Sequence, residues 1–135
     1  MTTVRVPGQP LASLDGLSRA NWLALRKGGI GSSDAPAVAG VDPWRSPYAV
    51  WAEKISEDWP DQDNSAMEWG RILEPVIARH FADVTGADVR TPPAMYVHPE
   101  RDWMRASPDR FTVNRDLNPI GVLEIKATGS KDAWA

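Results

Sequence analysis

Residues 107–127 read SPDRFTVNRDLNPIGVLEIKA, and the fold expected for the chain follows mainly from them. Two runs rich in apolar and β-branched residues flank the polar residues 114–119, a pattern typical of a β-hairpin. We expect the first strand to span residues 103–113 and the second to span residues 120–127. A further strand is expected at residues 91–97, so a sheet follows the N-terminal part of the chain.

The expected hairpin carries two acids and a lysine. Asp109 follows a proline at the start of the first run, and Glu124 and Lys126 lie in the second. Successive side chains on a strand alternate, so Glu124 and Lys126 would share one face. An acid among apolar residues is costly unless it is paired, and a divalent ion would relieve that cost. We therefore predict a metal site for phosphodiester hydrolysis, although a lone acid of this kind is an ordinary surface residue in most proteins.

The longest helical pattern spans residues 65–85 and ends before Gly86. Apolar residues recur at spacings of three and four, which predicts one buried stripe. The stripe consists of Trp69, Ile72, Leu73, Val76, Ile77, Phe81 and Val84. Glu74 lies beside it, where Pro75 should kink the helix. Glu74 is either a metal ligand, directly or through water, or a solvent-facing helix residue.

A glycine-rich stretch, RKGGIGSSD, occupies residues 26–34 between two expected helices. Gly29 and Gly31 would let the backbone approach a ligand closely. Arg26, Ser32 and Ser33 would supply positive charge and donors to an anion. The alternative is a plain joint in which Ser32 or Ser33 caps the second helix. The three shorter helices expected in this region span residues 18–27, 34–39 and 46–55.

The composition is typical of one globular domain with its own core, since the chain has 135 residues of which 42% are hydrophobic. A net charge of −3 argues against a broad basic surface, but local patches matter more than the total. There is no cysteine, no secretion signal and no apolar run of the roughly 20 residues that a membrane helix needs, so we expect a cytoplasmic protein. Residues 1–16 are expected to be irregular and mobile.

Four sequence blocks resemble, in order, the YqaJ-type viral recombinase nucleases, which are grouped with phage lambda exonuclease in the PD-(D/E)XK nuclease superfamily. The blocks are RKGGIGSSDA, EWGRILEP, SPDR and LEIK, and the resemblance covers residues 21–135. It implies an α+β, restriction-endonuclease-like fold. N-terminal helices would precede a mixed sheet whose β-hairpin carries the site.

The resemblance also implies a function. It is that of a Mg²⁺-dependent deoxyribonuclease, with Mn²⁺ as a substitute, from a phage or prophage in a bacterial host. Such enzymes digest the 5′ strand of duplex ends and leave a 3′ strand for an annealing protein, and they can form homo-oligomeric rings. The implied metal ligands are Asp109, Glu124 and the Ile125 carbonyl, with Glu74 nearby and Lys126 activating water. Arg26 and Ser33, or Ser32 one residue earlier, would hold the terminal phosphate of the DNA.

The family continues past the second strand of the hairpin with a helix that carries a glutamine, whereas this sequence ends at Ala135. Residues 17–135 are therefore expected to form the N-terminal part of a nuclease domain. Two alternatives remain open. One is a shortened, non-catalytic relative that binds DNA ends or protein, and the other is an endonuclease or CRISPR-associated nuclease of the same superfamily.

Overall fold

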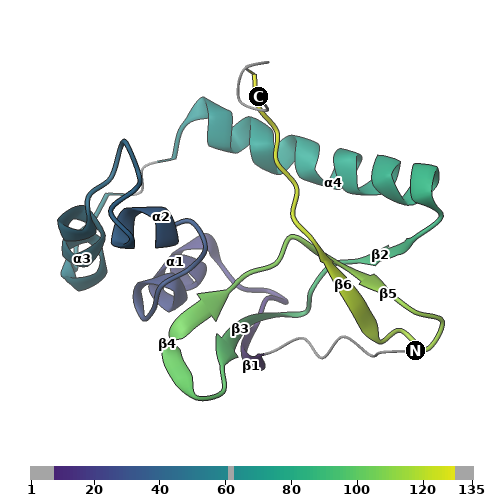
Figure 1. The fold of residues 1–135 in the computed structure, drawn as a ribbon, viewed down its shortest axis with the longest axis horizontal. Coiled ribbons are helices and arrows are strands. Elements are labelled where there is room, and N and C mark those ends of the chain that lie inside the picture. Colours follow the sequence, from purple (N-terminus) through teal and green to yellow (C-terminus); the bar gives the residue numbers. More distant parts are fainter. Residues whose placement is uncertain (1–7, 61–62, 130–135) are drawn as a thin grey trace. The chain divides into compact units, whose positions relative to one another are not determined.

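The computed structural model describes residues 8–60 and 63–129 (Figure 1). These residues divide into two compact units. The glycine-loop unit contains described residues 8–60 and 93–107, and the hairpin unit contains described residues 63–92 and 108–129. Helices and antiparallel sheets make up the two units, which confirms the α+β class. The expectations for residues 1–7 and 130–135 lie outside the described residues.

Three short helices and one sheet form the glycine-loop unit. The helices are α1 (Arg19–Lys27), α2 (Ala35–Val38) and α3 (Pro47–Ile55). The strands are β1 (Gln9–Ser13), β3 (Ala94–His98) and β4 (Arg101–Ala106), in the order β1-β3-β4. The hydroxyls of Ser18 and Ser46 cap α1 and α3, and the core of the unit contains Ala37, Val50 and Met95.

Strand β1 corrects the prediction that residues 1–16 are irregular. Residues 9–13 pair antiparallel with β3, and Pro10 lies opposite Tyr96. A proline is tolerated here because β1 is an edge strand, which needs hydrogen-bond partners on one side only. The register shifts between Pro10 and Ala12, which interrupts the alternation of side chains between the two faces of the strand. The sequence therefore lacks the alternating pattern by which a strand is recognised.

In the hairpin unit, the long helix α4 (Ser65–Thr85) precedes a second antiparallel sheet. Its strands are β2 (Asp88–Arg90), β5 (Arg110–Val113) and β6 (Pro119–Leu123), in the order β2-β5-β6. Helix α4 has the predicted bounds and continues through Pro75. Gly86 ends it with a φ of 70°, a left-handed conformation that glycine adopts without strain. Within the described chain, no helix combines the length and apolar character that a membrane crossing requires.

The predicted burial of the α4 stripe is wrong. Trp69, Val76 and Val84 are 59%, 61% and 71% exposed, while Ala78 is the residue of α4 that is buried. The helix packs against β2, and the two elements differ greatly in length. A helix of 21 residues is roughly 30 Å long, whereas a strand of 3 residues spans about 10 Å. So short a strand covers only part of the helix.

The single strand expected at residues 103–113 is two strands in two different sheets, β4 and β5. Pro108 lies between them, and its missing N–H and fixed φ interrupt a ladder. The strand expected at residues 120–127 likewise ends at Leu123. The described residues therefore form two antiparallel sheets where one mixed sheet was expected, although the β5–β6 hairpin itself is confirmed.

Candidate functional site

The end of the β5–β6 ladder is closed by a side chain. Arg110 is the first paired residue of β5 and lies opposite Leu123. Beyond that pair, the Ile125 N–H donates to Oδ2 of Asp109 at 2.7 Å. Pro108 has no N–H to donate across the hairpin, so the regular ladder stops there, and the Ile125 N–H is accepted by the Asp109 carboxylate rather than by a backbone carbonyl. This hydrogen bond fixes the predicted acid beside the segment that carries the other site residues.

Glu124 and Lys126 lie just beyond β6, outside regular strand structure. Their side chains still meet, because the Lys126 ammonium donates to the Glu124 carboxylate. That hydrogen bond is the main reason why the pKa of Lys126 is raised. Burial opposes it, and the charges of Glu124 and Asp109 raise the pKa further. The hairpin end thus places the lysine in the electrostatic field of both acids.

Glu74 on α4 is engaged by a residue that the sequence prediction missed. The Arg110 guanidinium binds the Glu74 carboxylate and the Asp109 carbonyl. Both side chains are partly buried, with 14% of Arg110 and 29% of Glu74 exposed. The sequence feature that could have pointed to Arg110 is its position directly after Asp109 in SPDR. Arginine at this place ties the helix acid to the start of β5.

The donor set at the hairpin end suits a hard cation. Asp109 and Glu124 supply carboxylate oxygens, and a carboxylate that accepts one N–H retains further lone pairs. An all-oxygen set that includes the Ile125 carbonyl fits Mg²⁺. Among residues 8–60 and 63–129, no group of three or more acids or histidines is arranged to hold a metal ion. The structure therefore does not gather Glu74 with the other two acids.

In the glycine-loop unit, the structure brings the predicted residues Arg26 and Ser33 into direct contact. The Arg26 guanidinium donates to Oγ of Ser33 at 2.6 Å and lies 4.7 Å from the centroid of the Trp22 ring. Ser32 and Ser33 are both exposed. Neither serine caps α2, whose N-cap position belongs to Asp34. Arg26 thus lies between the Trp22 ring and Ser33, the last residue of the glycine loop (residues 28–33).

The glycine loop packs against strand β4, and only some of its glycines have free space around them. The Ile30 N–H donates to the Trp103 carbonyl at 2.6 Å, and the Arg105 N–H donates to the Ile30 carbonyl at 3.0 Å. A Cβ on Gly29 would lie 2.7 Å from the Trp103 carbonyl oxygen. Gly29 is therefore needed for packing against β4, whereas a Cβ on Gly31 would meet no atom closer than 3.9 Å.

Asp34 is a buried acid that the sequence prediction did not single out. It is 1% exposed, and its carboxylate binds Lys54 at 2.9 Å and Arg45 at 3.3 Å. Burial by itself would raise the pKa of Asp34. Hydrogen bonds from Lys54 and Gly31, with the charges of Lys54 and Arg26, outweigh burial and hold that pKa below its usual value. The carboxylate is therefore ionised at neutral pH.

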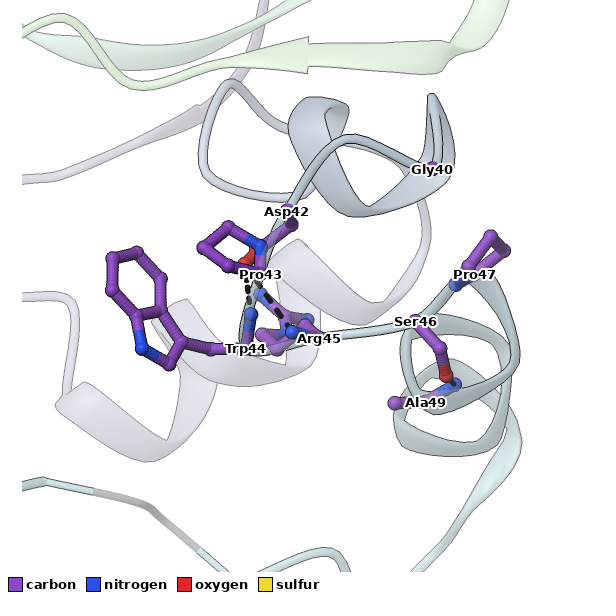
Figure 2. A pocket seen from close by; sticks show the side chains of 8 residues that line it. All are labelled: Gly40, Asp42, Pro43, Trp44, Arg45, Ser46, Pro47 and Ala49. Carbon is purple, nitrogen blue, oxygen red and sulfur yellow. Dashed lines mark hydrogen bonds between the residues drawn. The ribbon is translucent and has the colours of Figure 1, made fainter.

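An open pocket lies between α2 and α3, lined by Gly40, Asp42, Pro43, Trp44, Arg45, Ser46, Pro47 and Ala49. Figure 2 shows that the Asp42 carboxylate holds the loop, since it accepts the N–H groups of Trp44 and Arg45 at 2.8 and 3.2 Å. Trp44 is 90% exposed. The sequence prediction assigned no role to this loop.

The residues at the hairpin end and the Arg26–Ser33 pair lie in a domain of a known family. The chain belongs to the YqaJ-like viral recombinase domain family, whose model matches residues 21–134. It is 32% identical over 131 residues to the uncharacterized protein YqaJ of Bacillus subtilis strain 168, a match that covers 96% of this chain and 39% of that protein. The chain thus spans about two fifths of the length of that relative.

Two further similarities are more partial. Protein D345L of African swine fever virus (strain Badajoz 1971 Vero-adapted) is 34% identical over 55 residues, which is 41% of this chain and 16% of that protein. Among solved structures, the crystal structure of LHK-Exo in complex with dAMP matches with a TM-score of 0.64 and 25% identity. That match covers 85% of this chain and 55% of LHK-Exo, and it supports the fold class reached from the sequence.

Proposed function

We propose that the chain carries the catalytic core of a metal-dependent deoxyribonuclease that acts in recombination. The observation that carries the proposal is the hairpin end, where Asp109 is fixed by the Ile125 N–H and the Glu124–Lys126 pair follows directly. Family membership and the fold shared with LHK-Exo, solved with dAMP, support the same reading. A deoxynucleoside monophosphate is what stepwise hydrolysis of DNA releases.

The roles follow from the chemistry of each group. Asp109, Glu124 and the Ile125 carbonyl would hold Mg²⁺ or Mn²⁺, which would supply Lewis-acid activation of the phosphodiester and of water. Lys126 would present a compact positive charge to the developing charge on the phosphate. Glu74 would act through Arg110 or through water, because its carboxylate is engaged by that guanidinium.

Arg26 and Ser33, with Ser32 beside them, would bind the 5′ phosphate of a duplex end. A guanidinium has five N–H donors, so the hydrogen bond to Ser33 leaves others for phosphate oxygens. Binding of the 5′ phosphate would favour 5′-to-3′ digestion. The 3′ strand that remains would then be available to an annealing protein.

The test is cleavage of 5′-labelled linear duplex DNA by Asp109→Ala and Lys126→Ala variants in the presence of Mg²⁺. We expect each variant to lose about a hundredfold or more in rate, and EDTA to abolish wild-type cleavage. Asp116→Ala is the matched control, because Asp116 is an exposed acid in the turn of the same hairpin. Cleavage at the wild-type rate by both site variants would rule out the proposed centre. Closed circular DNA should resist an enzyme that requires ends.

One observation favours a second candidate, a DNA-end-binding relative that does not cleave. Glu74 is paired with Arg110, and the described part of the chain holds no cluster of three acids or histidines. Such a protein would bind 5′-phosphorylated duplex ends with the same affinity in Mg²⁺ and in EDTA. It would leave the DNA intact, so metal-dependent degradation by the purified protein excludes it.

A further inference from the structure

We propose that Asp34 is the positioning residue of the end-binding site, and that its buried carboxylate fixes the Arg26–Ser33 pair in the arrangement that receives a terminal phosphate. The inference rests on the proposed role of that pair, and it adds a residue that contributes without touching DNA. Asp34 follows Ser33 directly in the sequence. Its side chain points into the protein, since only 1% of the residue is exposed.

Both oxygens of the Asp34 carboxylate are bound within the protein. Oδ1 accepts from Arg45 at 3.3 Å, while Oδ2 accepts from the Gly31 N–H at 3.2 Å and pairs with Lys54 at 2.9 Å. Hydrogen bonds to ionised groups are stronger than neutral ones. One side chain therefore joins the glycine loop to α3 and to the loop before α3.

Lys54 extends this connection to Arg26. Besides its bond to Asp34, its ammonium donates to the backbone carbonyl of Arg26 at 3.0 Å. Lys27 makes a matching bond from α1, donating to the Ser56 carbonyl at 2.6 Å. Lys54 thus binds two groups at the same time: the side chain of Asp34, which follows Ser33, and the backbone carbonyl of Arg26.

This arrangement separates support from ligand contact. A bare carboxylate beside a phosphate site would repel the ligand, but Asp34 is buried and flanked by two cations. Arg26 and Ser33 remain at the surface and meet each other at 2.6 Å. Because binding geometry depends on groups held in place before the ligand arrives, loss of the Asp34 charge should weaken recognition of the phosphate specifically.

The experiment compares the affinities of the protein for duplex DNA with a 5′ phosphate and with a 5′ hydroxyl, measured by fluorescence anisotropy in EDTA. The variants are Asp34→Asn, Asp34→Glu and Lys54→Gln, and circular dichroism confirms that each is folded at the assay temperature. Glu57→Gln is the control, because it removes one negative charge from an exposed position after α3. Lys54→Gln removes the charge that pairs with Asp34 and shortens the side chain that reaches the Arg26 carbonyl, while Asp34 stays paired with Arg45, so it tests the proposal if Asp34→Asn does not fold.

We expect Asp34→Asn and Lys54→Gln to reduce the wild-type preference for the 5′ phosphate about tenfold, while Asp34→Glu restores part of it and Glu57→Gln retains it. A purely structural role would lower stability and leave this preference intact, so an unchanged preference in the folded variants overturns the proposal.

A wild type without any phosphate preference would instead refute the end-binding role of Arg26 and Ser33. Amide hydrogen exchange in residues 29–33 then decides the positioning role. Faster exchange in Asp34→Asn than in Glu57→Gln supports it, and equal exchange overturns it.

Discussion

Replacing Asp34 with asparagine removes a buried charge and keeps the size of the side chain. Asp34 is 1% exposed, and the side chain of its closest partner, Lys54, is 13% exposed. Removal of one partner from a buried ion pair costs about 3–5 kcal/mol, because the other charge is left uncompensated. Lys54 keeps its bond to the Arg26 carbonyl and Arg45 keeps Glu53, so we expect the lower end, about 3 kcal/mol of unfolding free energy.

Urea denaturation followed by tryptophan fluorescence measures this loss, since the chain contains 7 tryptophans. Glu57→Gln should change the unfolding free energy by no more than about 0.5 kcal/mol, as is usual for an exposed position. The double variant Asp34→Asn/Lys54→Gln should lose less than the sum of the two single variants, because the partners share one interaction. A loss below about 1 kcal/mol in Asp34→Asn would be that of a surface ion pair and would contradict the stabilising role given to the buried carboxylate.

Three further predictions concern stability. The pKa of Asp34 is lowered in the folded protein, so the ionised carboxylate contributes its full stability above the unfolded-state pKa of about 4. This stability is lost as the pH falls through the folded-state pKa. The urea midpoint should therefore drop less between pH 7 and pH 3 in Asp34→Asn than in wild type. Gly29→Ala forces a Cβ against the Trp103 carbonyl and should cost about 1–3 kcal/mol in thermal melts, whereas equal melting of Gly29→Ala and the uncrowded Gly31→Ala would contradict that reading. Ser46→Ala removes the cap of α3 and should cost about 1 kcal/mol, and an unchanged melting temperature would count against the cap.

The helices were predictable because their signals are local. Ser46 and Pro47 set the start of α3, and Gly86 ends α4, all within a few residues of the helices they bound. Caps, prolines and left-handed glycines act on backbone groups that are close in the sequence, so a short stretch of sequence is enough to recognise them. The strands were less accessible, since Pro108 divides one apolar run between two sheets and β1 finds its partner 81 or more residues away, as in the pair Ser13 and Ala94.

The family and the chemical groups of the candidate centre are evident from the amino-acid sequence: the acid after Pro108 and the glutamate–lysine pair beyond the hairpin. How these groups are held is seen only in the folded protein. The Asp109 carboxylate closes a ladder that a proline interrupts, Arg110 engages Glu74 on a distant helix, and Asp34 is buried among cations from α3 and its preceding loop. These roles depend on burial and on contacts between residues that are far apart in the sequence, and neither of these produces a local sequence pattern.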